Sequence, residues 1–419
     1  MVIVGIIGCL LVLLFVHTVL KDFKSPPFIL GALWLFAYVS LYIFKGGIAN
    51  FNSIYYLSFL IGLCFFVFGF FLKVGNRNRI NSNIIFERKS YIRFKLPYIQ
   101  IFLLIAFILF LIYIIKAALF VSKEFDFNFW RTLSRGRKTG DLNIPLVVEY
   151  SRSAIIALST VCGIIYFSNS SKLNRRHFIF SSIIALFYVV TAGNRGAIFL
   201  WVLSLTFSYL IIKNFDNRKL FSILWKMALI IIGIFVVTNF AKYVYTDQSD
   251  PLKFSINLIG HYFSSSTVAF VEWMKLPRDY LFGANTFRFF LAILDAIGMD
   301  VKVPELIQEE IHFYGDKTNI YTVLHYYTKD FGLLYAFVMQ LLMGMFYGVL
   351  YTHSTLSKKL NIFYIALLSI LYFPLINQFF DDKYFSILSS WIQLFFWIWL
   401  FTRKLFLTGD EIVVDDEIT

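Results

Sequence analysis

The chain has 419 residues, of which 59% are hydrophobic and only 15% are charged, and its mean hydropathy is +0.73. Soluble globular domains carry about 25% charged residues, so this composition excludes a water-soluble protein and predicts one that lies in lipid. Thirty-eight Lys and Arg against 25 Asp and Glu give a net charge of +13. In a membrane protein such an excess orients helices by the positive-inside rule, and we expect no nucleic-acid partner.

Apolar runs of about 20 residues, long enough to cross a hydrocarbon core of about 30 Å as helices, recur throughout the sequence. They predict an all-α polytopic integral membrane protein that forms one membrane domain over residues 1–419 and has eleven transmembrane helices. The predicted spans are 2–20, 27–45, 54–72, 98–121, 145–167, 178–192, 197–212, 220–240, 331–350, 361–380 and 384–402.

The connections between these spans alternate in character. One set is short and basic, as in SNSSKLNRRH and KNFDNRK, which is typical of cytoplasmic loops. This predicts an outside N-terminus and a cytoplasmic C-terminus. The opposite set contains one large extracytoplasmic loop, residues 241–330. Its apolar segments, such as TFRFFLAILDAIGMD, are too short or interrupted to span and predict short helices at the membrane surface.

Arg195 is the only charged residue between Phe178 and Ile212. A single helix over that stretch would be about 52 Å long, well beyond the bilayer core, so the sequence predicts two helices that reverse through Gly193-Asn194-Arg195-Gly196. The turn would place the guanidinium at the outer end of a helical hairpin. It could anchor to lipid headgroups there, or bind a phosphate together with the backbone of Asn194 and its flanking glycines.

Arg152 lies about two turns inside the fifth predicted span, where a charge is costly and needs a partner or a wet cavity. Glu149, three residues earlier, is one possible partner. A structural ion pair and a substrate contact both fit. If Arg152 lies beside Arg195, the two form a pocket suited to a phosphate or pyrophosphate, because arginine binds such groups with two parallel hydrogen bonds.

The segment TNIYTVLHYYTKDFG joins the large loop to the ninth predicted span. Tyr321 and His325 are four residues apart and share a helical face if the helix begins early. His325 suits a general base at neutral pH, although a lone histidine is more often structural. Asp330 is a nearby carboxylate. We interpret the adjacent pair Asp381 and Asp382 as a solvated loop tip.

Metal and cofactor signatures are absent from the sequence. There is no HExxH, CxxC, P-loop or GxSxG element, and the three cysteines lie in separate apolar runs. Metal-dependent membrane glycosyltransferases resemble one another in keeping a paired acidic motif in the first external loop. The first outer connection of this chain, GGIANFNS, contains no acidic residue. We therefore expect neither a metal nor a cofactor.

These features together resemble the bacterial oligosaccharide repeat-unit polymerases, the O-antigen or capsule polymerases of the Wzy type. The resemblance lies in about eleven helices, the GNRG turn, a basic outer loop before the fifth span, the large late outer loop, and the NIYT and KDFG stretches. It implies a metal-independent, ligase-like glycosyltransferase of the GT-C type in the bacterial inner membrane.

The resemblance also implies substrates and roles. Undecaprenyl-pyrophosphate-linked oligosaccharides would be donor and acceptor, and a chain-length regulator would be a possible protein partner. Arg195 would hold the pyrophosphate, with support from Arg152. Substrate contacts would come from Asn194 and Tyr321. His325 or an outer carboxylate such as Asp330 would deprotonate the acceptor hydroxyl. The outer-loop candidates for a second lipid-pyrophosphate site are Arg135, Arg278 and Arg288.

Three other functions stay open at this point. An O-antigen ligase, which transfers the glycan to a lipid A core, shares the donor and the expected fold. A flippase or transporter of the lipid-linked repeat would carry charges on several spans, whereas here they are few: Lys116, Glu149, Arg152 and Lys226. A non-enzymatic scaffold of envelope assembly would tolerate replacement of Arg195.

Overall fold

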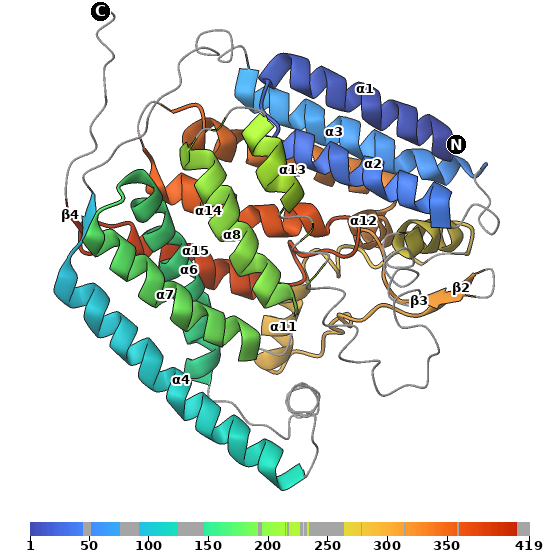
Figure 1. Cartoon of the computed structure of the whole chain (residues 1–419). Coiled ribbons are helices and arrows are strands. Elements are labelled where there is room, and N and C mark those ends of the chain that lie inside the picture. The colour runs from blue at the N-terminus through green and yellow to red at the C-terminus, as the bar shows by residue number, and fades with distance from the viewer. Residues whose placement is uncertain are drawn as a thin grey trace, which may run out of the picture. The chain divides into compact units, whose positions relative to one another are not determined.

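The computed structural model describes residues 1–44, 52–75, 92–124, 146–191, 195–213, 215, 218–226, 229, 233, 264–277, 279–313, 316–357 and 360–408. Over these ranges the chain is mostly helical, with four short strands (Figure 1). Seven described helices are long and apolar enough to cross a membrane: Val2–Leu20, Pro26–Ile43, Ile54–Val74, Pro97–Phe120, Leu146–Ser168, Gly196–Lys213 and Leu333–Ser354. Helix α1 (Val2–Leu20) leaves Leu11 and Leu14 more than half exposed, as expected of lipid-facing side chains.

The remaining predicted spans differ from these seven. Helix α7 (Lys172–Thr191) begins six residues before the predicted span 178–192 and includes three basic residues, which make it less apolar than the other long helices. Helices α14 (Ile362–Asn377) and α15 (Leu388–Phe401) are apolar but short, with 16 and 14 residues. The predicted span 220–240 lies mostly outside the described residues. The structure thus bears out a helical membrane protein, while the number eleven stays a prediction.

Contacts divide the chain into two compact units. The first comprises Met1–Asn83, Asp216–Thr352 and Pro374–Leu388, and the second comprises Ile84–Phe215, His353–Phe373 and Ser389–Thr419.

In the first unit, α1 packs with α2 (Pro26–Phe44) and α3 (Leu57–Val74), which follows the short 3-10 turn η1 (Ile54–Tyr56). Helix α3 also packs closely on α13 (Leu333–Ser354). A methyl group at Gly344 would overlap the carbonyl oxygen of Phe66, and one at Gly69 would overlap that of Leu341. Small residues allow such close backbone approach between membrane helices.

The part of the large loop that the structure describes forms short elements of this same unit. They are a helical stretch over residues 264–273, α11 (Arg288–Ala296), the antiparallel pair β2 (Ile311–Phe313) and β3 (Asp316–Thr318), and α12 (Val323–Phe331). The described part of the loop thus contains short helices, while their place at the membrane surface stays a prediction.

The second unit contains α4 (Leu96–Glu124), α6 (Leu146–Ser168), α7, α8 (Arg195–Lys213) and α15. Strand β1 (Arg93–Phe94) pairs with β4 (Leu407–Thr408) and joins the start of α4 to the end of α15. Helix α6 is largely buried and carries small polar residues that bond to its neighbours. Ser159 accepts a hydrogen bond from Trp201 on α8 (3.1 Å), and Ser151 donates one to Tyr188 on α7 (2.9 Å).

The stretch around Arg195 is two helices, as the sequence predicted. Helix α7 ends at Thr191 and α8 begins at Arg195. Two apolar runs joined by a glycine-containing tetrapeptide favour this reversal over one overlong helix.

Candidate functional site

Helix α12 is a nine-residue helix whose polar side chains are buried. Residues 323–328 and Asp330 are all buried, although the helix carries histidine, two tyrosines, threonine and aspartate. At its start the Val323 N–H donates to the Gln378 carbonyl (2.7 Å), and it ends at Gly332, whose φ of +88° favours glycine. Burying so many polar groups costs free energy unless each has a hydrogen-bond partner or takes part in function, so α12 is a candidate functional element.

His325 lies among three aromatic rings. Tyr321 stacks on its imidazole at 3.9 Å between ring centroids, while Trp273 and Tyr326 approach edge-on at 4.5 and 5.6 Å. The imidazole is 1% exposed. Burial, assisted by the positive charge of Lys329, lowers the pKa of His325 well below its ordinary value. The side chain is therefore neutral at physiological pH.

The Tyr321 contact was expected from the four-residue spacing. Tyr321 precedes α12, yet its ring still lies on that of His325, and its hydroxyl donates to the Glu309 carbonyl (3.1 Å). Burial raises the pKa of Tyr321 to about 12, so the hydroxyl stays protonated and serves as a donor.

Several buried polar atoms around α12 have no hydrogen-bond partner among the described residues. They are Thr322 Oγ1, His325 Nδ1 and Thr328 Oγ1, with both amide atoms of Gln340 on α13 and Gln378 Oε1. Buried polar atoms almost always have partners, so such atoms mark where a ligand or ordered water completes a site. Their concentration at α12 singles this helix out.

Asp330 is in a different situation, because both of its carboxylate oxygens are occupied. One accepts from the Asn285 backbone N–H (2.9 Å) and side-chain amide (3.0 Å), and the other from the Thr286 N–H (2.8 Å) and hydroxyl (2.6 Å). The side chain is fully buried. This geometry favours an anchoring role, in which Asp330 holds residues 285–286 to α12. Its predicted catalytic role stays untested.

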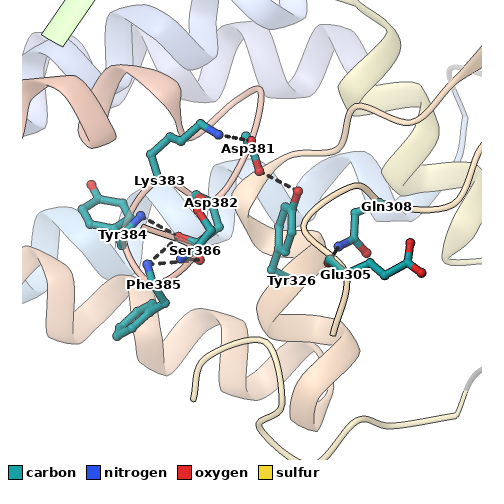
Figure 2. Close-up of polar contacts among 9 residues, drawn as sticks. All are labelled: Glu305, Gln308, Tyr326, Asp381, Asp382, Lys383, Tyr384, Phe385 and Ser386. Atoms are coloured by element: carbon teal, nitrogen blue, oxygen red, sulfur yellow. Dashed lines mark hydrogen bonds and ion pairs between the residues drawn. The ribbon is translucent and has the colours of Figure 1, made fainter. Parts of the chain in front are cut away.

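The interpretation of Asp381 and Asp382 as a solvated loop tip is wrong. Figure 2 shows Asp382 turned inward, where it accepts backbone hydrogen bonds from Tyr384 (2.9 Å) and Phe385 (3.2 Å). The Tyr327 hydroxyl also donates to Asp382 (3.2 Å), which is 1% exposed, and burial raises its pKa to about 6. Asp382 lies six residues before α15, and its carboxylate satisfies backbone N–H groups of the turn that leads into this helix, which explains its burial.

Asp381 is half-buried and connects the same loop to α12. It accepts a hydrogen bond from the Tyr326 hydroxyl (2.6 Å) and pairs with Lys383 (Figure 2). Tyr326 in turn contacts His325 edge-on. The loop before α15 therefore supplies a carboxylate to the neighbourhood of His325, which the sequence separates from it by more than 50 residues.

Arg288, the first residue of α11, is half-buried. Its Nε donates to the Pro304 carbonyl (2.7 Å), and its terminal nitrogens have no hydrogen-bond partner within the described ranges. The fork that binds a phosphate is thus left open. Arg135, Arg278 and Asn194, the other residues predicted for this role or beside Arg195, lie outside the described residues.

Arg152 and Arg195 both belong to the second unit. Helices α6, α7 and α8 follow one another through short connections and alternate in direction, so α6 and α8 are parallel. Ser159 bonds to Trp201 and Thr160 lies 3.0 Å from Ser204, which are shifts of 42 and 44 residues between α6 and α8. The intermediate shift of about 43 residues places the Arg152 and Arg195 backbones at one level, which is about two turns inside α6 and at the first residue of α8.

The predicted site residues therefore fall into two groups. His325, Tyr321, Asp330 and Arg288 belong to the first unit, and Arg152 and Arg195 to the second. Sequence reasoning missed Trp273, Asn285 and Thr286 as neighbours of α12, since only tertiary contacts connect them. Within the part of the chain that the structure describes, no cluster of three His, Cys, Asp or Glu side chains is placed to hold a metal ion.

No protein-family model, no curated protein and no solved structure matches this chain.

Proposed function

We propose that this membrane protein polymerises lipid-linked oligosaccharide repeat units on the outer face of the bacterial cytoplasmic membrane. In this proposal it is a metal-independent glycosyltransferase with eleven spans, a GT-C-type architecture, an outside N-terminus and a cytoplasmic C-terminus. Its substrates are undecaprenyl-pyrophosphate-linked oligosaccharides, and its product is O-antigen or capsular polysaccharide. The proposal rests on the resemblance carried by GNRG, NIYT and KDFG.

The structural observation that carries it is the register of α6 and α8. Arg195, the first residue of α8, and Arg152, about two turns inside α6, lie at one level along these parallel helices, in a protein whose spans hold few charges. Such a pair suits a pyrophosphate, because guanidinium groups bind phosphate oxygens with two parallel hydrogen bonds and keep their charge at any physiological pH. The start of α8 adds backbone N–H groups and the positive end of a helix dipole.

The chemistry requires a leaving group to be stabilised and a proton to be accepted. The acceptor sugar hydroxyl attacks the anomeric carbon of the donor glycan, and the bond from that carbon to the pyrophosphate oxygen breaks. Arg195 and Arg152 stabilise the negative charge that develops on the departing undecaprenyl pyrophosphate. The resemblance assigns acceptance of the hydroxyl proton to His325, whose Nδ1 has no hydrogen-bond partner among the described residues. Arg288 contacts the pyrophosphate of the acceptor lipid.

The test is the surface polysaccharide profile of a deletion strain complemented with wild type, Arg195→Ala or Arg195→Lys. We expect deletion and Arg195→Ala each to leave a lipid-core species that carries a single repeat, with poor rescue by lysine. The matched control is Arg175→Ala, which removes an exposed arginine from the first turn of α7, at the opposite end of that helix. This control is expected to keep the full ladder.

Two outcomes would overturn the proposal. A full ladder in Arg195→Ala, with expression equal to wild type, would leave the arginine a headgroup anchor. A deletion strain that accumulates long lipid-linked glycan with no capped core would identify a ligase.

A further inference from the structure

The segment from Tyr280 to Ile297 presents an unusual amount of apolar surface. Six of its large side chains are exposed, and Phe282 and Ile297 reach 78% and 66% exposure. The six are Tyr280, Phe282, Phe287, Phe290, Ile293 and Ile297. Exposed apolar patches of this kind mark surfaces that contact something other than water.

Helix α11 sorts these side chains to one face. Phe287, Phe290, Ile293 and Ile297 are spaced by three or four residues and therefore share one side of the helix, and no residue of α11 is buried. Arg288 and Asp295 lie on the opposite side, where Arg288 bonds to the Pro304 carbonyl. The half-buried Arg288 connects this polar side to the protein while Asp295 is exposed there, and the apolar side is left uncovered.

The segment is fixed to the end of a membrane-spanning helix. The Leu281 and Phe282 N–H groups donate to the carbonyls of Lys329 and Asp330 (2.9 and 3.0 Å), just before α13 begins at Leu333. Phe282 lies edge-on to Phe331, with 6.4 Å between ring centroids. These contacts hold residues 281–282, which precede α11, beside the segment that leads into α13.

Exposed apolar residues also line one side of α13, a helix long and apolar enough to cross a membrane. Exposed residues recur along α13 at four-residue intervals and form a stripe. Phe331 precedes the N-terminal end of this stripe, and its ring lies edge-on to that of Phe282. The stripe consists of Leu334, Val338, Leu342 and Phe346. Since the side of α13 that carries it faces lipid, its continuation toward α11 meets lipid as well.

We propose that α11 lies flat in the membrane–water interface, with Phe287, Phe290, Ile293 and Ile297 inserted between lipid headgroups and acyl chains. At nine residues, or about 14 Å, the helix is too short to cross the bilayer. Its apolar face and opposed charges match the pattern of helices that lie on membranes. The partner is the lipid bilayer itself, and the inference needs no assumption about the reaction.

Spin labels on the two sides of α11 test this proposal. The full chain has three cysteines, Cys9, Cys64 and Cys162, which are replaced by alanine. Single cysteines at Phe290 and Ile293, and at Asp295 and Ala296 as controls on the other side, are labelled with a nitroxide in phospholipid nanodiscs. The collision rates with oxygen, which concentrates in lipid, and with a water-soluble nickel chelate are then measured. All four positions lie outside the core, so the labels are compatible with folding.

We expect labels at 290 and 293 to collide several-fold more with oxygen and several-fold less with nickel than labels at 295 and 296. Equal nickel collision on both sides would place α11 in water and overturn the proposal. Protection of 290 and 293 from both reagents would also overturn it, because a protein surface would then cover the face.

Discussion

Replacing Asp330 with asparagine is expected to destabilise the protein strongly. An asparagine has one acceptor oxygen, so it keeps at most two of the four hydrogen bonds that the carboxylate accepts from Asn285 and Thr286. Its NH₂ group then faces two donors. Hydrogen bonds to a buried charged group contribute about 1.5–3 kcal/mol each, so losing two predicts a loss of about 3–6 kcal/mol.

Thr286→Val removes only the hydroxyl bond and should cost about 1.5–3 kcal/mol by the same reasoning. Asp300→Asn is the matched control, because it makes the same chemical change at an exposed carboxylate of the same loop. The free energy of unfolding is measured in mixed micelles with a rising fraction of sodium dodecyl sulfate. We expect the free energy of unfolding to be lowest for Asp330→Asn, higher for Thr286→Val, and equal to that of wild type for Asp300→Asn.

The anchoring role would be refuted if Asp330→Asn had the same free energy of unfolding as wild type but had lost polysaccharide polymerisation. That result would favour the catalytic role predicted from the sequence. The two roles are therefore separable by one variant and two readouts.

Three further predictions concern other parts of the molecule. Because burial lowers the folded-state pKa of His325, the unfolded chain takes up the proton first, so stability should fall as pH drops below about 6.5 and His325→Gln should flatten that slope in pH-dependent unfolding. Lys329→Gln removes the nearby positive charge and should raise the pKa of His325, which moves the acid limb of the activity profile to higher pH; an unchanged limb would exclude His325 as the titrating base. Gly344→Ala should cost roughly 1–3 kcal/mol, because its methyl overlaps the Phe66 carbonyl, whereas Gly233→Ala, which meets open space, should not destabilise in the same unfolding assay.

Much of the fold could be read from the sequence because membrane helices are defined by local composition. Apolar runs of span length predict the ends of α1 and α2 to within one residue and those of α3 and α13 to within about four, and the glycines around Arg195 predict the break between α7 and α8. Helix ends were less predictable where charges or caps intervene. The three basic residues at the start of α7 are helical although the sequence there is typical of a loop, and α15 begins only after the turn in which Asp382 accepts the Tyr384 and Phe385 N–H groups.

In the candidate site, too, contacts within one local segment were more predictable than contacts between distant segments. The four-residue spacing predicted that Tyr321 and His325 would share a helical face, but α12 begins at Val323, so their rings stack although Tyr321 precedes the helix. The burial of Asp382, the four bonds to Asp330 and the level register of Arg152 with Arg195 depend on segments far apart in the chain. Hydrogen bonds and packing between such segments form only in the folded protein, so the sequence by itself determined a helical membrane protein and its local motifs, and only the tertiary structure decided which polar groups meet.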